Sequence, residues 1–315
     1  MGTMAAGFVN HQRGPNLKDM KIRCFILLFL TAFASAVTGT YTQHTAKWKG
    51  ITRYYAVYVP KLQSGSMVVF LHATSSARFI PYSHVSAWEQ VSDQGGFIMV
   101  WPISTLDPSG PQATWHWECD GCSSGFPETP DDSGFLRWLI TSLQSQYSIS
   151  PGKTFVAGMS SGGFMTHRVG MESSDVIAAI APVSGMQYIQ PSGTKFVPPL
   201  VPNPVSVYEL HGDLDGAVPY CGGVKYYWSG VRAFSPSIDS DVSFWDGPNA
   251  NNCREFSQSQ PLCTAGQPTP NVNGQDATGC LEGVEVRFER EVGEGHTWPA
   301  GTEAKIWAFF QAHSR

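Results

Sequence analysis

The chain has 315 residues, of which 42% are hydrophobic and 14% are charged, and its formal net charge is −5. This length and composition allow a large buried core and exclude a chain that is disordered throughout. A negative net charge is unfavourable for binding phosphate backbones, so no nucleic-acid partner is expected.

The N-terminal segment has the pattern of a secretory signal. Lys21 and Arg23 precede an apolar run over 24–33, and small residues follow it up to Ala36. The run is too short to span a bilayer, so we expect cleavage after Ala36 and no membrane anchor. Residues 1–36 are thus expected to be an N-terminal extension with a signal peptide. Residues 37–315 are expected to form a single extracellular domain.

Beyond residue 36, apolar runs that suit buried strands alternate with amphipathic segments that suit helices. The expected strands are 51–60, 66–73, 96–102, 153–159, 176–185, 205–212 and 284–292. The expected helices are 85–94, 133–147, 162–172 and 302–313. This alternation is typical of an α/β protein with a mainly parallel central sheet flanked by helices.

The stretch over 236–283 shows neither pattern, and we expect an irregular, disulfide-pinned insertion before the last strand, near the rim of the functional site. An even number of cysteines in an exported chain is typical of disulfides. Those beyond residue 36 are Cys119, Cys122, Cys221, Cys253, Cys263 and Cys280. The sequence allows many pairings, and our working hypothesis joins Cys253 to Cys280, Cys221 to Cys263 and Cys119 to Cys122.

The segment CDGC (119–122) would also suit a redox or zinc motif. A zinc site of this kind needs a second Cys or His pair at ligand spacing, and the sequence offers none. An oxidising compartment would close the pair as a disulfide. We therefore expect neither a metal nor a cofactor.

The strongest chemical signal is the segment GMSSG (158–162), which lies between the expected strand 153–159 and the expected helix 162–172. Gly-x-Ser-x-Gly in a strand-turn-helix setting is typical of a nucleophile elbow, a sharp turn that presents a serine hydroxyl. The glycines allow close backbone approach, and the helix N-terminus favours developing negative charge. The motif alone would also fit a glycine-rich turn, but its setting favours Ser160 as a nucleophile.

Two later segments supply the partners of such a serine. HGDLDGAVP (211–219) follows the expected strand 205–212, and it resembles the pattern HGxxDxxVP common in hydrolases with such an elbow, which implies Asp215 rather than Asp213 as the triad acid. His296 lies in a glycine-flanked loop between the last strand and the last helix, where the base belongs. His72 and His211 end strands and are expected to be structural.

A serine nucleophile also needs donors for the oxyanion that forms during acyl transfer. We expect the backbone N–H of Ser161 and that of Thr74, in the loop after strand 66–73, to form this oxyanion hole.

From about Tyr54 onward, the chain resembles the secreted esterases of carbohydrate esterase family 1, the feruloyl esterase and polyhydroxybutyrate depolymerase group. The likeness rests on PDDSGFLRWLI (130–140), YSISPGKTFVAGMSSGGFMTHRV (147–169), HGDLDGAVPY (211–220) and GEGHTWPAG (293–301). It implies an α/β-hydrolase fold, an ester substrate that is small or polysaccharide-linked, and the triad Ser160, Asp215 and His296. His72-Ala73-Thr74 departs from the commoner His-Gly-Cys or His-Gly-Gly, which alters the oxyanion loop.

Within that group, Trp115, Trp117 and Trp298 are candidates to stack on an aromatic acid or a sugar ring, although tryptophans also fill cores. The leading hypothesis is a feruloyl esterase that releases hydroxycinnamic acids from plant cell-wall polysaccharide. Acetylxylan esterase and polyhydroxybutyrate depolymerase use the same triad and are alternatives. A non-catalytic secreted binding protein and a peptidase on the same fold are remote alternatives.

Overall fold

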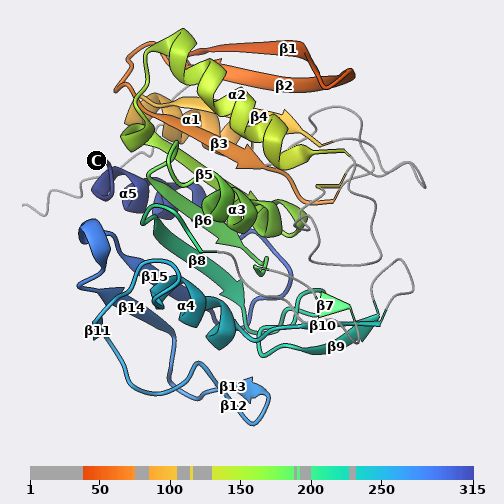
Figure 1. Ribbon diagram of the computed structural model, residues 1–315, viewed down its shortest axis with the longest axis vertical. Helices are drawn as coiled ribbons and strands as arrows, with labels where there is room; N and C mark the ends of the chain where they lie inside the picture. The colour runs from red at the N-terminus through yellow and green to blue at the C-terminus, as the bar shows by residue number, and fades with distance from the viewer. Residues whose placement is uncertain are drawn as a thin grey trace, which may run out of the picture. The chain divides into compact units, whose positions relative to one another are not determined.

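The structure is a computed structural model that describes residues 38–74, 85–104, 114–115, 130–187, 190–191, 200–226 and 232–315. Across these ranges, one ten-stranded sheet has the order β1-β2-β4-β3-β5-β6-β8-β15-β14-β11 (Figure 1). Its strands are β1 (Thr40–Trp48), β2 (Ile51–Val59), β3 (Met67–Leu71), β4 (Ile98–Ile103), β5 (Thr154–Met159), β6 (Ala179–Val183), β8 (Ser206–Gly212), β11 (Glu255–Phe256), β14 (Gly274–Thr278) and β15 (Val286–Glu291). The strands from β4 to β15 are parallel, and both edges of the sheet are antiparallel.

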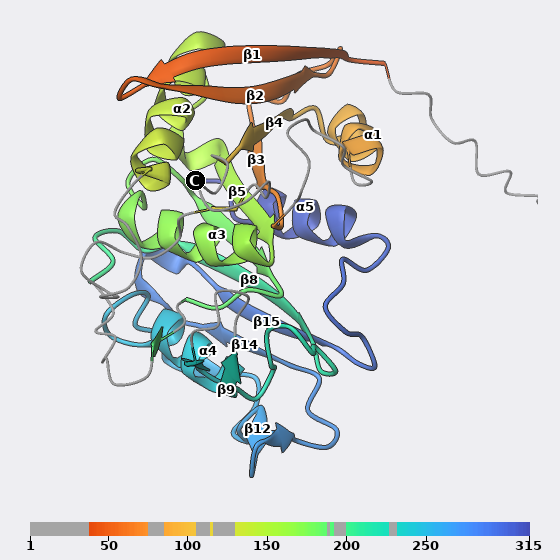
Figure 2. The same ribbon diagram turned by 90° about the vertical axis from the view of Figure 1, so that its right-hand side faces the viewer.

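Helices cover both faces of this sheet. They are α1 (Val85–Gly95), α2 (Asp132–Tyr147), α3 (Ser161–Glu172), α4 (Ile238–Asp246) and α5 (Thr302–Ala312). Helices α2 and α3 lie on one face, and α1 and α5 lie on the other (Figures 1 and 2). Within the described ranges, no helix is both long enough and apolar enough to cross a bilayer.

The two faces explain why the central strands are apolar throughout. In β3, Met67, Val69 and Leu71 belong to the core cluster that includes residues of α2 and α3. The alternate residues Val68 and Phe70 belong to the cluster that includes residues of α1 and α5. Because side chains alternate across a strand, a strand covered on both faces needs apolar residues at every position.

This architecture confirms the expected α/β-hydrolase fold, with a mainly parallel sheet flanked by helices. The stretch over 236–283 is pinned by disulfides and precedes the last strand, as expected, but it is not irregular, because it contains α4 and β14, and β14 pairs antiparallel with β15. The remaining short elements are β7 (Gln190–Pro191), β9 (Gly223–Tyr226), β10 (Arg232–Ser235), β12 (Cys263–Thr264) and β13 (Gln267–Pro268), with single 3₁₀ turns at Pro151–Lys153 and Leu281–Gly283.

Two of the expected disulfides are present. Cys221 is bonded to Cys263, and Cys253 is bonded to Cys280. The first ties the chain just after the Asp215 loop to β12, and the second ties the segment after α4 to the approach to β15. The expected pair Cys119–Cys122 lies outside the described residues.

Candidate active site

Ser160 occupies the sharp turn between β5 and α3. Its backbone has φ 54° and ψ −119°, a strained conformation for a residue with a side chain. The Ser160 N–H donates to the Val183 carbonyl on the neighbouring strand β6, at 2.9 Å. A residue held in this way at the end of a buried strand presents its side chain at the carboxyl edge of the sheet.

The two glycines of the motif make this turn sterically accessible. A Cβ on Gly158 would lie 2.4 Å from the Gly162 carbonyl oxygen. A Cβ on Gly162 would lie 2.0 Å from the Leu71 carbonyl oxygen at the end of β3. Helix α3 therefore begins directly against β3, which places the loop after β3 beside the serine.

The structure brings the three predicted triad residues together in one hydrogen-bonded chain. His296 Nε2 lies 2.8 Å from Ser160 Oγ, and His296 Nδ1 lies 2.7 Å from Asp215 Oδ2. Since ionised Asp215 only accepts, Nδ1 carries the ring hydrogen and Nε2 is free to accept from the serine hydroxyl. Ser160 comes from the turn after β5, Asp215 from the loop after β8, and His296 from the loop after β15.

Hydrogen bonds to both of its carboxylate oxygens fix the position of Asp215. Its Oδ1 atom accepts from the backbone N–H groups of Ala217, at 2.8 Å, and Val218, at 2.7 Å. Burial favours the neutral acid, but hydrogen bonds and charge from His211 and His296 outweigh burial and hold the pKa of Asp215 well below its usual value. The group is therefore a carboxylate throughout the pH range in which an esterase works.

Asp213, the competing candidate, is engaged elsewhere. Its Oδ2 atom accepts from Arg290 Nε and Nη2, at 2.8 and 2.6 Å, and its Oδ1 atom accepts from the Gly293 N–H. Asp213 thus joins the loop after β8 to the loop after β15, and Asp215 alone of the two contacts His296.

The predicted oxyanion donors lie on the two segments that meet at Gly162. Within the described part of the chain, neither the N–H of Ser161, the first residue of α3, nor that of Thr74 donates a hydrogen bond. Two backbone donors without an acceptor among the described residues, at such a junction, suit the stabilisation of a developing oxyanion.

His72 fixes the loop that carries Thr74. Its Nε2 accepts from the Ser104 N–H at 3.1 Å, so Nδ1 carries the ring hydrogen and donates to the Ala73 carbonyl at 2.6 Å. Burial lowers the pKa of His72 to about 4, which keeps the ring neutral near pH 7. This support holds the loop although Ala73 replaces the glycine of the commoner pattern.

The structure describes two of the three tryptophan candidates, Trp115 and Trp298, and both are engaged in packing. Trp115 is only 2% exposed, and its indole N–H donates to the His72 carbonyl at 2.9 Å, so its expected contact with substrate is corrected to a place in the core. Trp298 packs edge-on against Phe70, with ring centroids 5.1 Å apart, and donates to Glu303 at 2.9 Å. Both contacts anchor the His296 loop. Trp117 lies outside the described residues.

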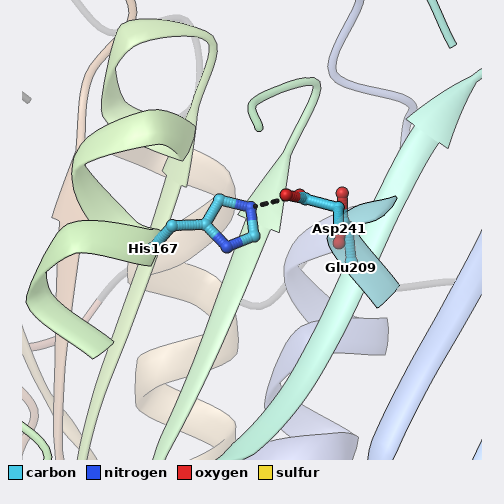
Figure 3. Close-up of side chains that lie close together, drawn as sticks. All are labelled: His167, Glu209 and Asp241. Atoms are coloured by element: carbon cyan, nitrogen blue, oxygen red, sulfur yellow. Dashed lines mark ion pairs between the residues drawn. The ribbon is translucent and has the colours of Figure 1, made fainter. Parts of the chain in front are cut away.

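A second polar cluster, which the sequence analysis did not identify, lies in the core. His167 of α3, Glu209 of β8 and Asp241 of α4 are all buried, and His167 Nε2 lies 3.1 Å from Asp241 Oδ2 (Figure 3). The three offer ligand atoms within 4.8 Å of one another, which suggests a metal site. Their positions, 32 or more residues apart in sequence, gave no local signal.

The hydrogen bonds of His167 argue against a metal. The Trp245 indole nitrogen, which can only donate, lies 2.9 Å from His167 Nδ1. Nδ1 is therefore the acceptor, Nε2 carries the ring hydrogen, and the ring offers a metal no lone pair. Burial, and then the charge of Asp241, raises the pKa of Glu209 well above its usual value. The cluster is better described as a neutral histidine beside two buried carboxyl groups, of which Glu209 has the raised pKa.

Comparisons with known proteins point to esterases. A bifunctional acetylxylan esterase/xylanase of Neocallimastix patriciarum is 23% identical over 266 residues, covering 83% of this chain and 33% of that protein. Feruloyl esterase B of Piromyces equi is 29% identical over 189 residues, covering 58% and 32%. Poly(3-hydroxybutyrate) depolymerase of Ralstonia pickettii is 26% identical over 272 residues, covering 79% and 51%. No family model matches the chain.

The solved structure of an acetyl xylan esterase from Aspergillus awamori has a TM-score of 0.55 at 18% identity, covering 87% of this chain and 99% of that one. At this identity the likeness concerns the fold. The chain spans about a third to a half of the length of the curated relatives named above. These relatives belong to the group that the sequence motifs resemble. The predicted resemblance is therefore confirmed.

Proposed function

We propose that this chain is a serine carboxylesterase that works through an acyl-enzyme. The observation that carries the proposal is the unbroken hydrogen-bonded chain from Asp215 through His296 to Ser160. Esterases among both the curated relatives and the solved structures support the same reaction class. Retention of all three polar groups in contact argues against a binding protein that has lost its chemistry.

The geometry supplies each proton step. Ser160 Oγ attacks the ester carbonyl carbon while His296 Nε2 takes the hydroxyl proton, and Asp215 stabilises the charged imidazole. When the tetrahedral intermediate collapses, His296 returns the proton to the departing alcohol and the acyl group stays on Ser160. Water then repeats the sequence, releasing the acid and restoring the hydroxyl. The Ser161 and Thr74 N–H groups are the proposed oxyanion donors.

The proposed substrate class is an acylated plant cell-wall polysaccharide. Acetylxylan esterases among the relatives support an acetyl ester, and feruloyl esterases support a hydroxycinnamoyl ester. The case for an aromatic acyl group is weaker than the sequence suggested, because Trp115 and Trp298 are occupied in packing. An extracellular location is supported by the two disulfides, which persist in oxidising compartments.

The test is acid release from four esters: methyl ferulate, p-nitrophenyl acetate, acetylated xylan and a hydroxybutyrate oligomer. Ser160→Ala should lower kcat by about 10⁶-fold on every ester that the wild type cleaves. Ser173→Ala is the matched control, since Ser173 is a buried serine at the opposite end of α3. It should keep activity within a few-fold of wild type.

Each outcome has a distinct meaning. Preference for ferulate, acetyl or hydroxybutyrate identifies the acyl group without changing the mechanism. Ester hydrolysis that survives in the Ser160 variant would overturn the triad. Cleavage of peptides without turnover of any ester would indicate a peptidase, and turnover of neither would leave a binding protein.

A further inference from the structure

His211 is the residue before the last in β8, four residues before Asp215, and its side chain is fully buried. Its Nε2 atom lies 2.9 Å from the Val218 carbonyl oxygen and 3.4 Å from Asp215 Oδ2. A carbonyl and a carboxylate can only accept hydrogen bonds. The ring hydrogen is therefore on Nε2, and it is directed at the loop that carries the acid.

The hydrogen bond from His211 to Val218 joins the start of the Asp215 loop to its end. The Val218 N–H donates to Asp215 Oδ1, while the Val218 carbonyl accepts from His211. The Asp215 N–H donates to the Gly212 carbonyl, next to His211 in the chain. Asp215 Oδ2 is thus placed between two histidine N–H groups, that of His296 at 2.7 Å and that of His211.

We propose that His211 is a positioning residue, which holds Asp215 Oδ2 in line with His296 Nδ1. This inference rests on the proposed function. Within the described part of the chain, backbone N–H groups donate to Oδ1 and not to Oδ2, so without His211 the Oδ2 atom keeps His296 as its one partner there. His211 also packs edge-on against Tyr220, with centroids 6.0 Å apart, but an apolar side chain could replace that contact. The donated hydrogen bond is what an apolar side chain cannot replace.

Two substitutions separate these contributions. His211→Leu keeps apolar packing and removes the donor, and we expect kcat to fall about 10- to 100-fold with KM within about 3-fold, the loss typical of a hydrogen bond to a charged group. His211→Gln places an amide N–H near the position of Nε2 and should recover most of kcat. Thermal unfolding of each variant reports any loss of stability.

A spectroscopic readout distinguishes positioning from general destabilisation. The hydrogen shared by His296 Nδ1 and Asp215 Oδ2 should give a low-field proton resonance in the wild type and in His211→Gln. In His211→Leu this resonance should move or broaden in protein that is still folded. A folded His211→Leu variant with wild-type kcat and an unmoved resonance would overturn the inference, and so would an equal loss of kcat in both variants.

Ser160→Ala, assayed in parallel, keeps the two proposals apart. If Ser160→Ala retains ester hydrolysis, the proposed function fails whatever His211 does; if it is inactive and His211→Leu is not impaired, only the present inference fails. Should His211→Leu not fold, His211→Asn replaces it, because its amide is too short to reach Val218 and Asp215. Activity in the Asn variant equal to that in the Gln variant would then contradict the role of His211.

Discussion

Asp213 and Asp215 are two residues apart on one loop, and their contacts separate their roles. Asp215 is buried and joined to His296, and hydrogen bonds keep it ionised against the effect of burial. Asp213 accepts two hydrogen bonds from Arg290 of β15 through its Oδ2 atom, and its Oδ1 atom accepts from Gly293 in the loop after β15. The same residue type at neighbouring positions therefore belongs to the proposed triad in one case and connects segments of the fold in the other.

Exchanging each carboxylate for an amide should separate these roles. Asp215→Asn removes the charge that stabilises protonated His296 and offers the ring a donor, which favours the wrong tautomer, so kcat should fall by about 10³- to 10⁴-fold with the fold intact. Asp213→Asn weakens the Arg290 pair and should lower the melting temperature while kcat stays within about 10-fold. Steady-state kinetics and thermal unfolding of both variants check this, and the opposite pattern would reassign the acid.

At the scale of an element, α4 carries acidic residues at both ends with opposite consequences. Asp239, in its first turn, accepts from the backbone N–H groups of Leu262 and Cys263, at 2.6 and 2.9 Å. Asp246 is the last residue of the helix, where the carbonyl ends of the peptide dipoles disfavour negative charge. Burial raises the pKa of Asp246 to about 6, although a hydrogen bond from Gln275 opposes the shift.

Because of this raised pKa, we expect ionisation of Asp246 to lower the unfolding free energy as pH rises. The folded protein binds the Asp246 proton more tightly than the unfolded chain does. The contribution of this proton to the unfolding free energy is therefore complete below about pH 4 and is lost as pH rises through about 6. Asp246→Asn cannot ionise and should gain about 1 kcal/mol of unfolding free energy relative to wild type between about pH 5 and pH 7, a value reduced for partial exposure. Urea unfolding at both pH values measures the gain.

Asp239→Asn is the matched control within α4. It weakens two charge-assisted hydrogen bonds at the N-terminal end, so it should lower the unfolding free energy. A gain for Asp246→Asn that is equal at both pH values would contradict ionisation as its cause.

At the scale of the whole molecule, the sheet brings the residues of the proposed triad to one edge, although Ser160 and His296 are 136 residues apart in the chain. The parallel strands β5, β8 and β15 end in the loops that carry Ser160, Asp215 and His296 respectively. Two disulfides brace the C-terminal half, and only Cys221–Cys263 begins directly after the Asp215 loop.

Removing each disulfide by paired Cys→Ala substitution should distinguish their contributions. The bonds close loops with sequence separations of 42 and 27 residues, so each loss should cost about 3–4 kcal/mol of unfolding free energy. Cys221→Ala with Cys263→Ala should also lower kcat, because it releases one end of the Asp215 loop. Cys253→Ala with Cys280→Ala should leave kcat within a few-fold. Denaturant unfolding and kinetics test both, and an equal loss of kcat in the two would refute the distinction.

Local patterns in the sequence determined much of this protein. The strand-turn-helix around Ser160 is local, and so are the buried central strands, which are apolar at every position because both faces are covered. The order Ser160, Asp215, His296 then sufficed to predict which side chains meet, because parallel strands present their carboxyl ends at one edge. The structure shows this contact.

The tertiary structure alone decided features that depend on pairing between distant segments. Strand β1 is largely exposed and carries no apolar alternation, so only its partner β2 defines it. Helix α4 and strand β14 are short, and they are ordered by packing and by pairing with β15. Trp298 and His211 could not be assigned from their own neighbours in sequence, because an aromatic ring or a buried histidine acquires its role from the groups that the folded chain places around it.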